Sequence, residues 1–247
     1  MEVHHHPDLH HSKKKWKEYF LEFLMIFLAV TMGFIAENFR EYLTTKEKEY
    51  EYIHSLIHNL EQDKTDIINT IGDNQKKLND LDSLLSLSSY SKLNPVNKRS
   101  LYQYSRMVSF YSSFSSNDAT MTQLKNTGGL QYIRKDHIAD SISRYDEIVR
   151  SINAAEIPYS KAINDAVDAV SELLLFKVWK DTAYFKNGMA TNKELPLLYD
   201  NPQKLNIFFN KISLERGWTQ NYLNNLQEKL PFTIKLIDLL KKEYEIN

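Results

Sequence analysis

Residues 39–85 read FREYLTTKEKEYEYIHSLIHNLEQDKTDIINTIGDNQKKLNDLDSLL, and this stretch decides the fold class. Its apolar side chains recur in alternating steps of three and four residues, at Phe39, Leu43, Tyr50, Ile53, Ile57, Leu60, Ile67, Ile71, Leu78, Leu81 and Leu85. The remaining positions of this apolar seam hold Lys46, Lys64 and Asn74. A heptad pattern of this length is typical of a coiled-coil or bundle helix. We therefore expect one long helix over residues 38–87, ended by the serine-rich stretch before Pro95.

Two further long helices are predicted downstream. The same rhythm resumes near Asp136, which can cap a helix, and runs toward Asp181 with an expected kink at Pro158. Asn201 followed by Pro202 is a typical helix start, a cap and then proline in the first turn. The third helix is expected over residues 203–245, with irregularities at Gly217 and Pro231.

Three long helices with short connections predict an all-α fold, an elongated up-down-up bundle. In that arrangement the second helix returns toward the start of the first. Residues 96–134, with their short helices, would then form the membrane-distal tip, and residues 181–201 would lie near the membrane.

The stretch before the seam is apolar enough to cross a membrane. Residues 19–36 read YFLEFLMIFLAVTMGFIA, with Glu22 as the one charge, and eighteen residues of helix reach about 27 Å. A cleaved signal peptide is the alternative, but Phe34 fits poorly two residues before Ala36 at a cleavage site. We expect an uncleaved signal-anchor over residues 19–37.

Basic residues set the expected orientation. Four lysines precede the span closely, whereas Arg40, Lys46 and Lys48 follow it more loosely. The rule that positive charge stays inside places residues 1–18 in the cytoplasm as a His- and Lys-rich tail. It places residues 38–247 outside the inner membrane, as a periplasmic domain on a single-pass anchor.

One face of the span carries small residues. Glu22, Ala29, Gly33 and Ala36 share it at near-helical spacing. Small residues four apart let two helices approach closely, so this face is a candidate for self-association. The carboxylate has two other interpretations: it reaches back to water from one turn inside the boundary, or it lines a proton or ion pathway.

Composition excludes several function classes. The chain has 247 residues and no cysteine, which excludes disulfides and thiol chemistry. A net charge of −1, from 31 basic and 32 acidic residues, gives no basic face for nucleic acid. No phosphate loop, dinucleotide fingerprint or His-Glu-x-x-His motif is present. We expect neither an enzyme nor a cofactor.

Histidines offer the candidate metal ligands. One group lies in the N-terminal tail and comprises His4, His5, His6, His10 and His11. Imidazole suits zinc, nickel and copper, although a solvated tail lacks the partners that fix such ligands. His54 and His58, four apart on the first long helix, form a second candidate pair, with a solvated face as the alternative.

Aromatic side chains gather around the expected tip, at Tyr102, Tyr104, Phe110, Tyr111 and Phe114. They are either the local core of short helices or a partner-binding surface, because tyrosine-rich patches serve interfaces well. After them, SSNDATMTQLKNTGGLQYIRKDHI predicts a short helix from Asp118 to Asn126. Gly128 would end that helix in a left-handed conformation, with Leu130 and Ile133 folding back.

This stretch, together with WKEYFLEFLMIFLAVTMGFIAENFREY at residues 16–42, resembles uncharacterised single-span envelope proteins of Bacteroidota. The resemblance covers about half the chain, the span, the first helix and this connector. It implies a topology and no activity.

The sequence as a whole favours a membrane-anchored scaffold or accessory subunit of an envelope complex. The expected partners are the membrane and either further copies of the chain or other proteins of that complex. Two alternatives remain open. One is an extracytoplasmic ligand sensor that works through a partner, and the other is a metal-handling protein that uses the N-terminal histidines.

Overall fold

The computed structural model describes residues 15–89, 93–187, 189–191 and 193–246 of the chain. Two compact units make up the chain, residues 1–51 and residues 52–247, and each is described by itself. We call the second unit the helical body.

The chain is almost entirely helical, so the prediction of an all-α fold is confirmed. In the described ranges the elements are α1 (Trp16–Ser86), η1 (Leu87–Ser89), α2 (Pro95–Ser105), α3 (Ala119–Asn126), η2 (Gly129–Tyr132), α4 (Asp136–Leu173), η3 (Phe176–Lys180), β1 (Phe185–Lys186), β2 (Met189–Ala190) and α5 (Pro202–Glu243). The two short strands pair antiparallel within a stretch that the sequence analysis expects as a loop.

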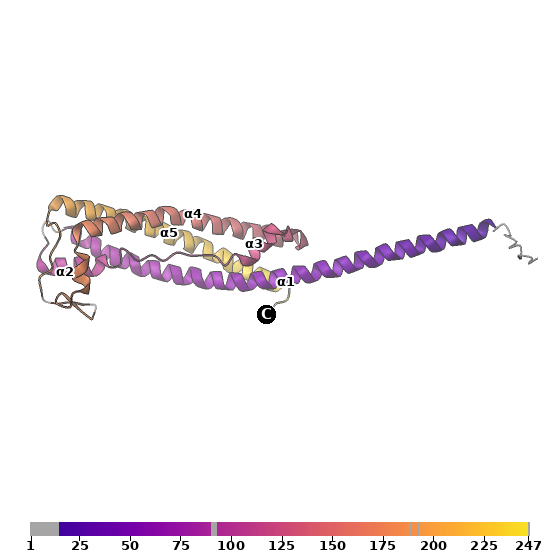
Figure 1. The fold of residues 1–247 in the computed structure, drawn as a ribbon, viewed down its shortest axis with the longest axis horizontal. Helices are drawn as coiled ribbons and strands as arrows, with labels where there is room; N and C mark the ends of the chain where they lie inside the picture. Colours follow the sequence, from indigo (N-terminus) through magenta and orange to yellow (C-terminus); the bar gives the residue numbers. More distant parts are fainter. Residues whose placement is uncertain (1–14, 90–92, 188, 192, 247) are drawn as a thin grey trace, which may run out of the picture. The chain divides into compact units, whose positions relative to one another are not determined.

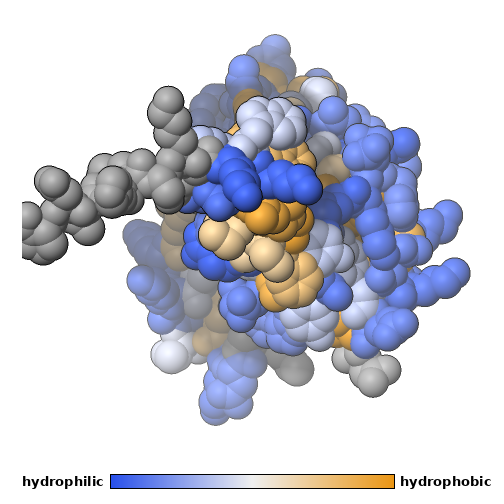
Figure 2. Space-filling view, turned by 90° about the vertical axis from the view of Figure 1, so that its right-hand side faces the viewer, coloured by the Kyte–Doolittle hydropathy of each residue, from blue (hydrophilic) through white to orange (hydrophobic). Residues whose placement is uncertain are grey.

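The first part of α1 is apolar and open to its surroundings. Its large side chains are more than half exposed at Phe23, Met25 and Ile26, and the same holds along most of this stretch. Viewed from the N-terminal end of α1, apolar side chains stand uncovered near the centre, beside hydrophilic ones (Figure 2). By length and composition this helix can cross a membrane, as an anchor or as a signal sequence.

In the helical body, α4 and α5 lie alongside the part of α1 that follows residue 52 (Figure 1). Three apolar clusters fill the space between them. One cluster joins Ile53 to Ile138 and Leu240, the next joins Ile67 to Ile152 and Leu226, and the last lies around Leu81. The seam between Ile53 and Leu81 is therefore buried against the chain's own helices.

The order of helix directions differs from the expected one. Tyr145 near the start of α4 bonds Asp63, and Lys135 just before α4 pairs with Glu243 at the end of α5. Thus α4 runs parallel to α1, and α5 runs back against both. The prediction that the second helix returns is wrong.

The chain runs back along the helical body through an extended segment and not through a helix. Residues 110–118 have no regular secondary structure and can span about 30 Å. With the preceding turn they form the connector, which we define as residues 106–118. It leads from α2 back to α3, where Asn59 of α1 donates to the Thr120 hydroxyl at 2.8 Å.

The expected tip, residues 96–134, is consequently divided between the two ends of the helical body. Leu101 of α2 packs in the cluster around Leu81, whereas Met121 of α3 packs in the cluster around Ile53. Residues 181–201 lie with α2, since the Tyr102 hydroxyl donates to the Pro196 carbonyl at 2.6 Å. The first placement corrects the single tip of the sequence analysis, and the cause is the connector.

Helix ends follow local sequence chemistry closely. Asn201 caps α5 as predicted, its side chain accepting from the Gln203 amide at 2.8 Å, with Pro202 in the first turn. Gly128 adopts the predicted left-handed conformation, with φ of 66°, after α3. By contrast, Asp136 lies inside α4 and does not cap it.

Neither the internal prolines nor Gly217 interrupts the long helices. Helix α4 continues through Pro158, and α5 continues through Gly217 and Pro231. The chain leaves α4 after Leu173, earlier than the expected end near Asp181.

Candidate functional site

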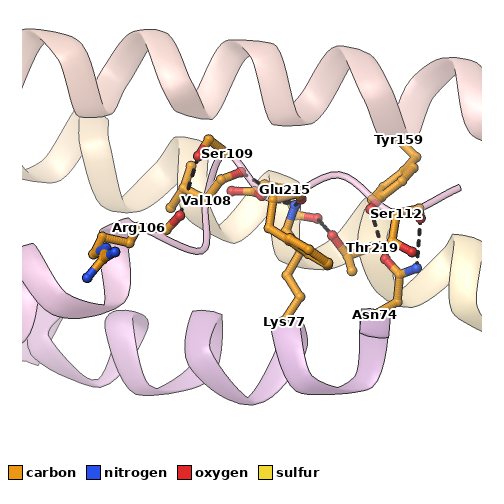
Figure 3. Close-up of polar contacts among 10 residues, drawn as sticks. Asn74, Lys77, Arg106, Val108, Ser109, Ser112, Tyr159, Glu215 and Thr219 are labelled. Atoms are coloured by element: carbon orange, nitrogen blue, oxygen red, sulfur yellow. Dashed lines mark hydrogen bonds and ion pairs between the residues drawn. The ribbon is translucent and has the colours of Figure 1, made fainter. Parts of the chain in front are cut away.

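A buried ion pair occupies the middle of the helical body. Lys77 Nζ of α1 lies 2.7 Å from Glu215 Oε1 of α5, and neither side chain has exposed surface. The lysine also donates to the carbonyl oxygens of Phe110 at 2.6 Å and Val108 at 3.4 Å. Figure 3 shows Lys77 reaching from α1 toward Glu215 beside the connector. One ammonium group thus binds the connector and α5 together.

Burial shapes the electrostatics of this pair. It raises the pKa of Glu215 to about 7, although Lys77 acts to lower it. Burial likewise lowers the pKa of Lys77, with Glu215 opposing the change. Apart from Lys77, no donor in the described chain reaches either Glu215 carboxylate oxygen. Because desolvation offsets much of the attraction in such pairs, we assign this one a role in specifying the packing.

A second polar group lies next to the ion pair and centres on Asn74 (Figure 3). The Asn74 side chain donates to the Ser112 carbonyl at 2.9 Å and accepts from the Tyr159 hydroxyl at 2.8 Å. Tyr159 stacks on Tyr222 with 4.7 Å between ring centroids. The Tyr222 hydroxyl accepts from the Phe114 amide at 2.9 Å. This group joins the connector to all three long helices.

Burial keeps these phenols protonated. It raises the pKa of Tyr222 to about 12 and raises that of Tyr159 as well. Both hydroxyls are therefore neutral at any ordinary pH, and Tyr159 remains a donor to Asn74.

Asp63 anchors the far end of the connector. Its carboxylate is almost fully buried and accepts from the Ser116 hydroxyl at 2.8 Å, the Asn117 amide at 2.7 Å and the Tyr145 hydroxyl at 2.5 Å. Burial raises the pKa of Tyr145, and the neighbouring Asp63 charge adds to that rise. Three donors around one carboxylate explain how a charge is accommodated there.

These groups form one connector network: Lys77, Glu215, Asn74, Tyr159, Tyr222, Asp63 and Tyr145. It supplies hydrogen bonds to a segment that has no secondary structure of its own to do so. Since Lys77 and Glu215 are closed to solvent, a substrate cannot touch either while the helices stay packed. What the network does in this structure is to hold the connector in place by hydrogen bonds.

The small-residue face of the first unit is open. Ala29, Gly33 and Ala36 are all exposed, and Glu22 is partly exposed. A Cβ placed on Gly33 would meet nothing within 4 Å. Ala29, Gly33 and Ala36 therefore leave room for another helix on this side of α1.

Of the histidine candidates, the structure describes His54 and His58, and it brings no further ligand to this pair. His54 and His58 are exposed, and Nε2 of His58 lies 3.2 Å from the Gln62 side-chain amide. Within the described ranges no three His, Asp or Glu residues gather as a metal site would. His4, His5, His6, His10 and His11 lie outside the described residues.

The aromatic group does not form one surface. Tyr102 and Phe114 are buried, in two different clusters, so the prediction of a partner-binding role is wrong for both. Burial in the core, the alternative, describes them. Tyr104 is half-buried, and Phe110 and Tyr111 remain partly exposed at 36% and 45%.

Sequence reasoning missed most of the network. The heptad pattern identifies Asn74 only as a polar position in the seam. It does not identify Lys77, Glu215 or Asp63. A signal was present for one of them: Glu215 stands three residues after Ile212, on the apolar side of its helix. A charge on a buried face requires a partner of opposite sign on another helix.

Comparison with known proteins finds no relative: no family model, no curated protein and no solved structure matches the chain.

Proposed function

We propose that this protein is a non-enzymatic scaffold or accessory subunit, held in the inner membrane by a single helix. The observation that carries the proposal is α1 itself. One uninterrupted helix, Trp16–Ser86, passes from an exposed apolar stretch into a packed helical body. The same helix thus supplies both the candidate anchor and the first element of the folded domain.

In this proposal the N-terminus is cytoplasmic and the helical body is periplasmic, as the lysines before the span favour. The chain's partners are then the membrane and an envelope complex. The proposed relation to single-span envelope proteins of Bacteroidota rests on the sequence resemblance alone.

Self-association is proposed through the span and not through the whole seam. From Ile53 onward the seam residues are buried or half-buried within one chain, so they offer little apolar surface to a second copy. Gly33 and its neighbours Ala29 and Ala36 remain open. Close approach of small residues is what drives helix pairing in lipid.

The test is native mass spectrometry of the untagged protein after gentle detergent extraction from membranes. We expect a discrete complex that is lost when Ala29 and Gly33 are both changed to leucine. Phe27→Leu with Thr31→Leu, on the opposite side of the helix, is the matched control and should leave the complex intact.

A complex that survives the Ala29→Leu and Gly33→Leu changes would contradict self-association through this face. A protein released from membranes by alkaline carbonate would contradict the anchor. Copies of this chain alone in the complex favour a scaffold, and other proteins in fixed ratio favour an accessory subunit.

A further inference from the structure

Helix α5 carries a second heptad pattern on the side that faces away from the core. Its buried pattern runs from Leu205 through Ile212 to Leu226 in steps of three and four residues. The same steps recur two residues later, and two residues turn a helix by about 200°. The positions of this second pattern are all exposed, and we call them the outer seam: Ile207, Asn210, Leu214, Gly217, Asn221 and Asn224.

The outer seam includes large apolar side chains that nothing in the helical body covers. Ile207 is 50% exposed and Leu214 is 58% exposed, and Trp218 beside the seam is 40% exposed. A Cβ placed on Gly217 would meet nothing within 4 Å, so the backbone is open to close approach at this point. Neighbouring exposed apolar side chains on a folded domain mark an interaction surface.

The outer side of α5 also lacks charge. Between Gln203 and Gln227 every exposed residue of this helix is uncharged. The cations of this stretch lie at the flanks and are paired with carboxylates of α4 or α1, as Lys204–Glu172, Lys211–Asp165 and Arg216–Asp82. A solvated helix face ordinarily carries charges, whereas depletion of charge marks the centre of a protein interface.

The absence of charge favours one kind of partner. A strongly acidic or basic protein, or an anionic membrane surface, finds no opposite charge on the outer seam. A twofold interface places each patch against itself, so a second copy of this uncharged face meets no like charge. Each asparagine amide supplies both donors and an acceptor, so asparagine against asparagine satisfies both groups.

The residues of the outer seam also favour one direction of pairing. In a parallel pair each seam residue meets its own copy, so Leu214 meets Leu214 and Asn221 meets Asn221. In an antiparallel pair centred between Leu214 and Gly217, Ile207 would instead face Asn224. That arrangement sets apolar side chains against glycine and amides. Asparagine at one such position also specifies the register of a parallel pair.

We propose that the outer seam binds the outer seam of a second copy of this chain, as a parallel, in-register pair of α5 helices. The inference rests on the proposed self-association, and it gives the helical body a contact of its own in addition to that of the span. Ile207 and Leu214 form the apolar part of the pair. Gly217 is the point of closest approach, and Asn221 forms the polar pair.

The test uses the lack of cysteine in the chain. Asn221→Cys gives the full-length protein one thiol, so a disulfide between two copies joins residue 221 to residue 221. In-register pairing brings the two Cα atoms to about 4.4–6.8 Å, the distance that a disulfide spans. We expect mild oxidation of intact membranes to give a disulfide-linked dimer at least about tenfold faster than for Asn164→Cys, at an exposed asparagine of α4.

A second change locates the contact. Leu214→Glu puts two like charges in the seam and should abolish cross-linking of Asn221→Cys, whereas Ile157→Glu, at an exposed isoleucine of α4, should not. Both positions are exposed, so thermal unfolding should match that of the wild type. Cross-linking that Leu214→Glu leaves unchanged, a rate equal to that of Asn164→Cys, or a cross-link to a different protein would overturn the proposal.

This test gives a separate result from the test of the span. A complex in native mass spectrometry without cross-linking at residue 221 refutes the α5 pairing alone and leaves the scaffold proposal standing. Cross-linking at residue 221 that persists in the protein with Ala29→Leu and Gly33→Leu supports the α5 pairing independently of the span.

Discussion

At the residue scale, Lys77 and Glu215 form a buried ion pair that adds little net stability. The loss of one partner alone is nevertheless costly. Two carbonyls and one carboxylate surround the ammonium group, and the carboxylate has only the lysine. The two partners are therefore unequal: the loss of Lys77 leaves Glu215 unpaired in the core, with no other donor nearby.

Lys77→Met should lower the free energy of unfolding by about 3–5 kcal/mol, because it leaves one buried charge unpaired. Lys77→Met with Glu215→Leu should recover most of that loss, since both desolvated charges are gone. Chemical denaturation of the detergent-solubilised protein measures both. The control is Lys76, the exposed neighbour of Lys77: Lys76→Met should change the free energy of unfolding by less than about 0.5 kcal/mol. A double variant as unstable as the single one would contradict this account.

Glu215 should also make stability depend on pH. Burial raises its pKa to about 7 from an ordinary value of 4.5, so between these values the folded state binds more protons than the unfolded state. Stability from this group is therefore full at low pH and is lost as pH rises through about 7. This prediction is tested by the midpoints of thermal unfolding of the wild type and of Glu215→Gln, measured from pH 5 to 8. The difference between the two should change across that window, and parallel curves would refute the prediction.

At the scale of elements, the connector is the unusual part. Nine extended residues, 110–118, lie against three helices and depend on side chains for their hydrogen bonds. Asp63 is the strongest of these attachments, since three donors converge on it.

Asp63→Ala should release the α3 end of the connector. We expect a loss of at least about 2 kcal/mol in stability, because the buried Tyr145 hydroxyl and two part-buried connector donors lose their acceptor. Amide hydrogen exchange should accelerate at Asn117 more than at the helix cores. Asp66→Ala, an exposed aspartate three residues along α1, is the control and should change neither quantity. Unchanged exchange at Asn117 in Asp63→Ala would show that the connector is held by other contacts.

The connector also marks the limit of what sequence can predict here. Periodicity identifies the long helices, and cap chemistry identifies Asn201 and Gly128, because both are local properties. The direction of each helix depends on residues 106–118, which have neither period nor cap. Lys77 escapes notice for a related reason: its burial depends on the connector and on Glu215, more than one hundred residues away.

At the scale of the whole molecule, the chain's lack of cysteine allows a direct test of orientation. Single cysteines at Ser12 and at the exposed Ser171 report on the two sides of the span. In cells with a permeabilised outer membrane, an impermeant maleimide should label S171C and should reach S12C only after the inner membrane is broken. The reverse pattern would invert the orientation, and labelling of both positions from outside would contradict a single-pass anchor.

The pairing of Ile53 with Leu240 has a consequence for how the protein is made. The start of the helical body packs against its last helix, and Lys241 pairs with Glu61 across 180 residues of sequence. In a nascent chain the side of α1 that faces α5 therefore stays uncovered until α5 has been translated. The cluster is complete only when the last part of α5 is present, and a chain halted at Leu230 would be more sensitive to proteases along Ile53 and Leu56.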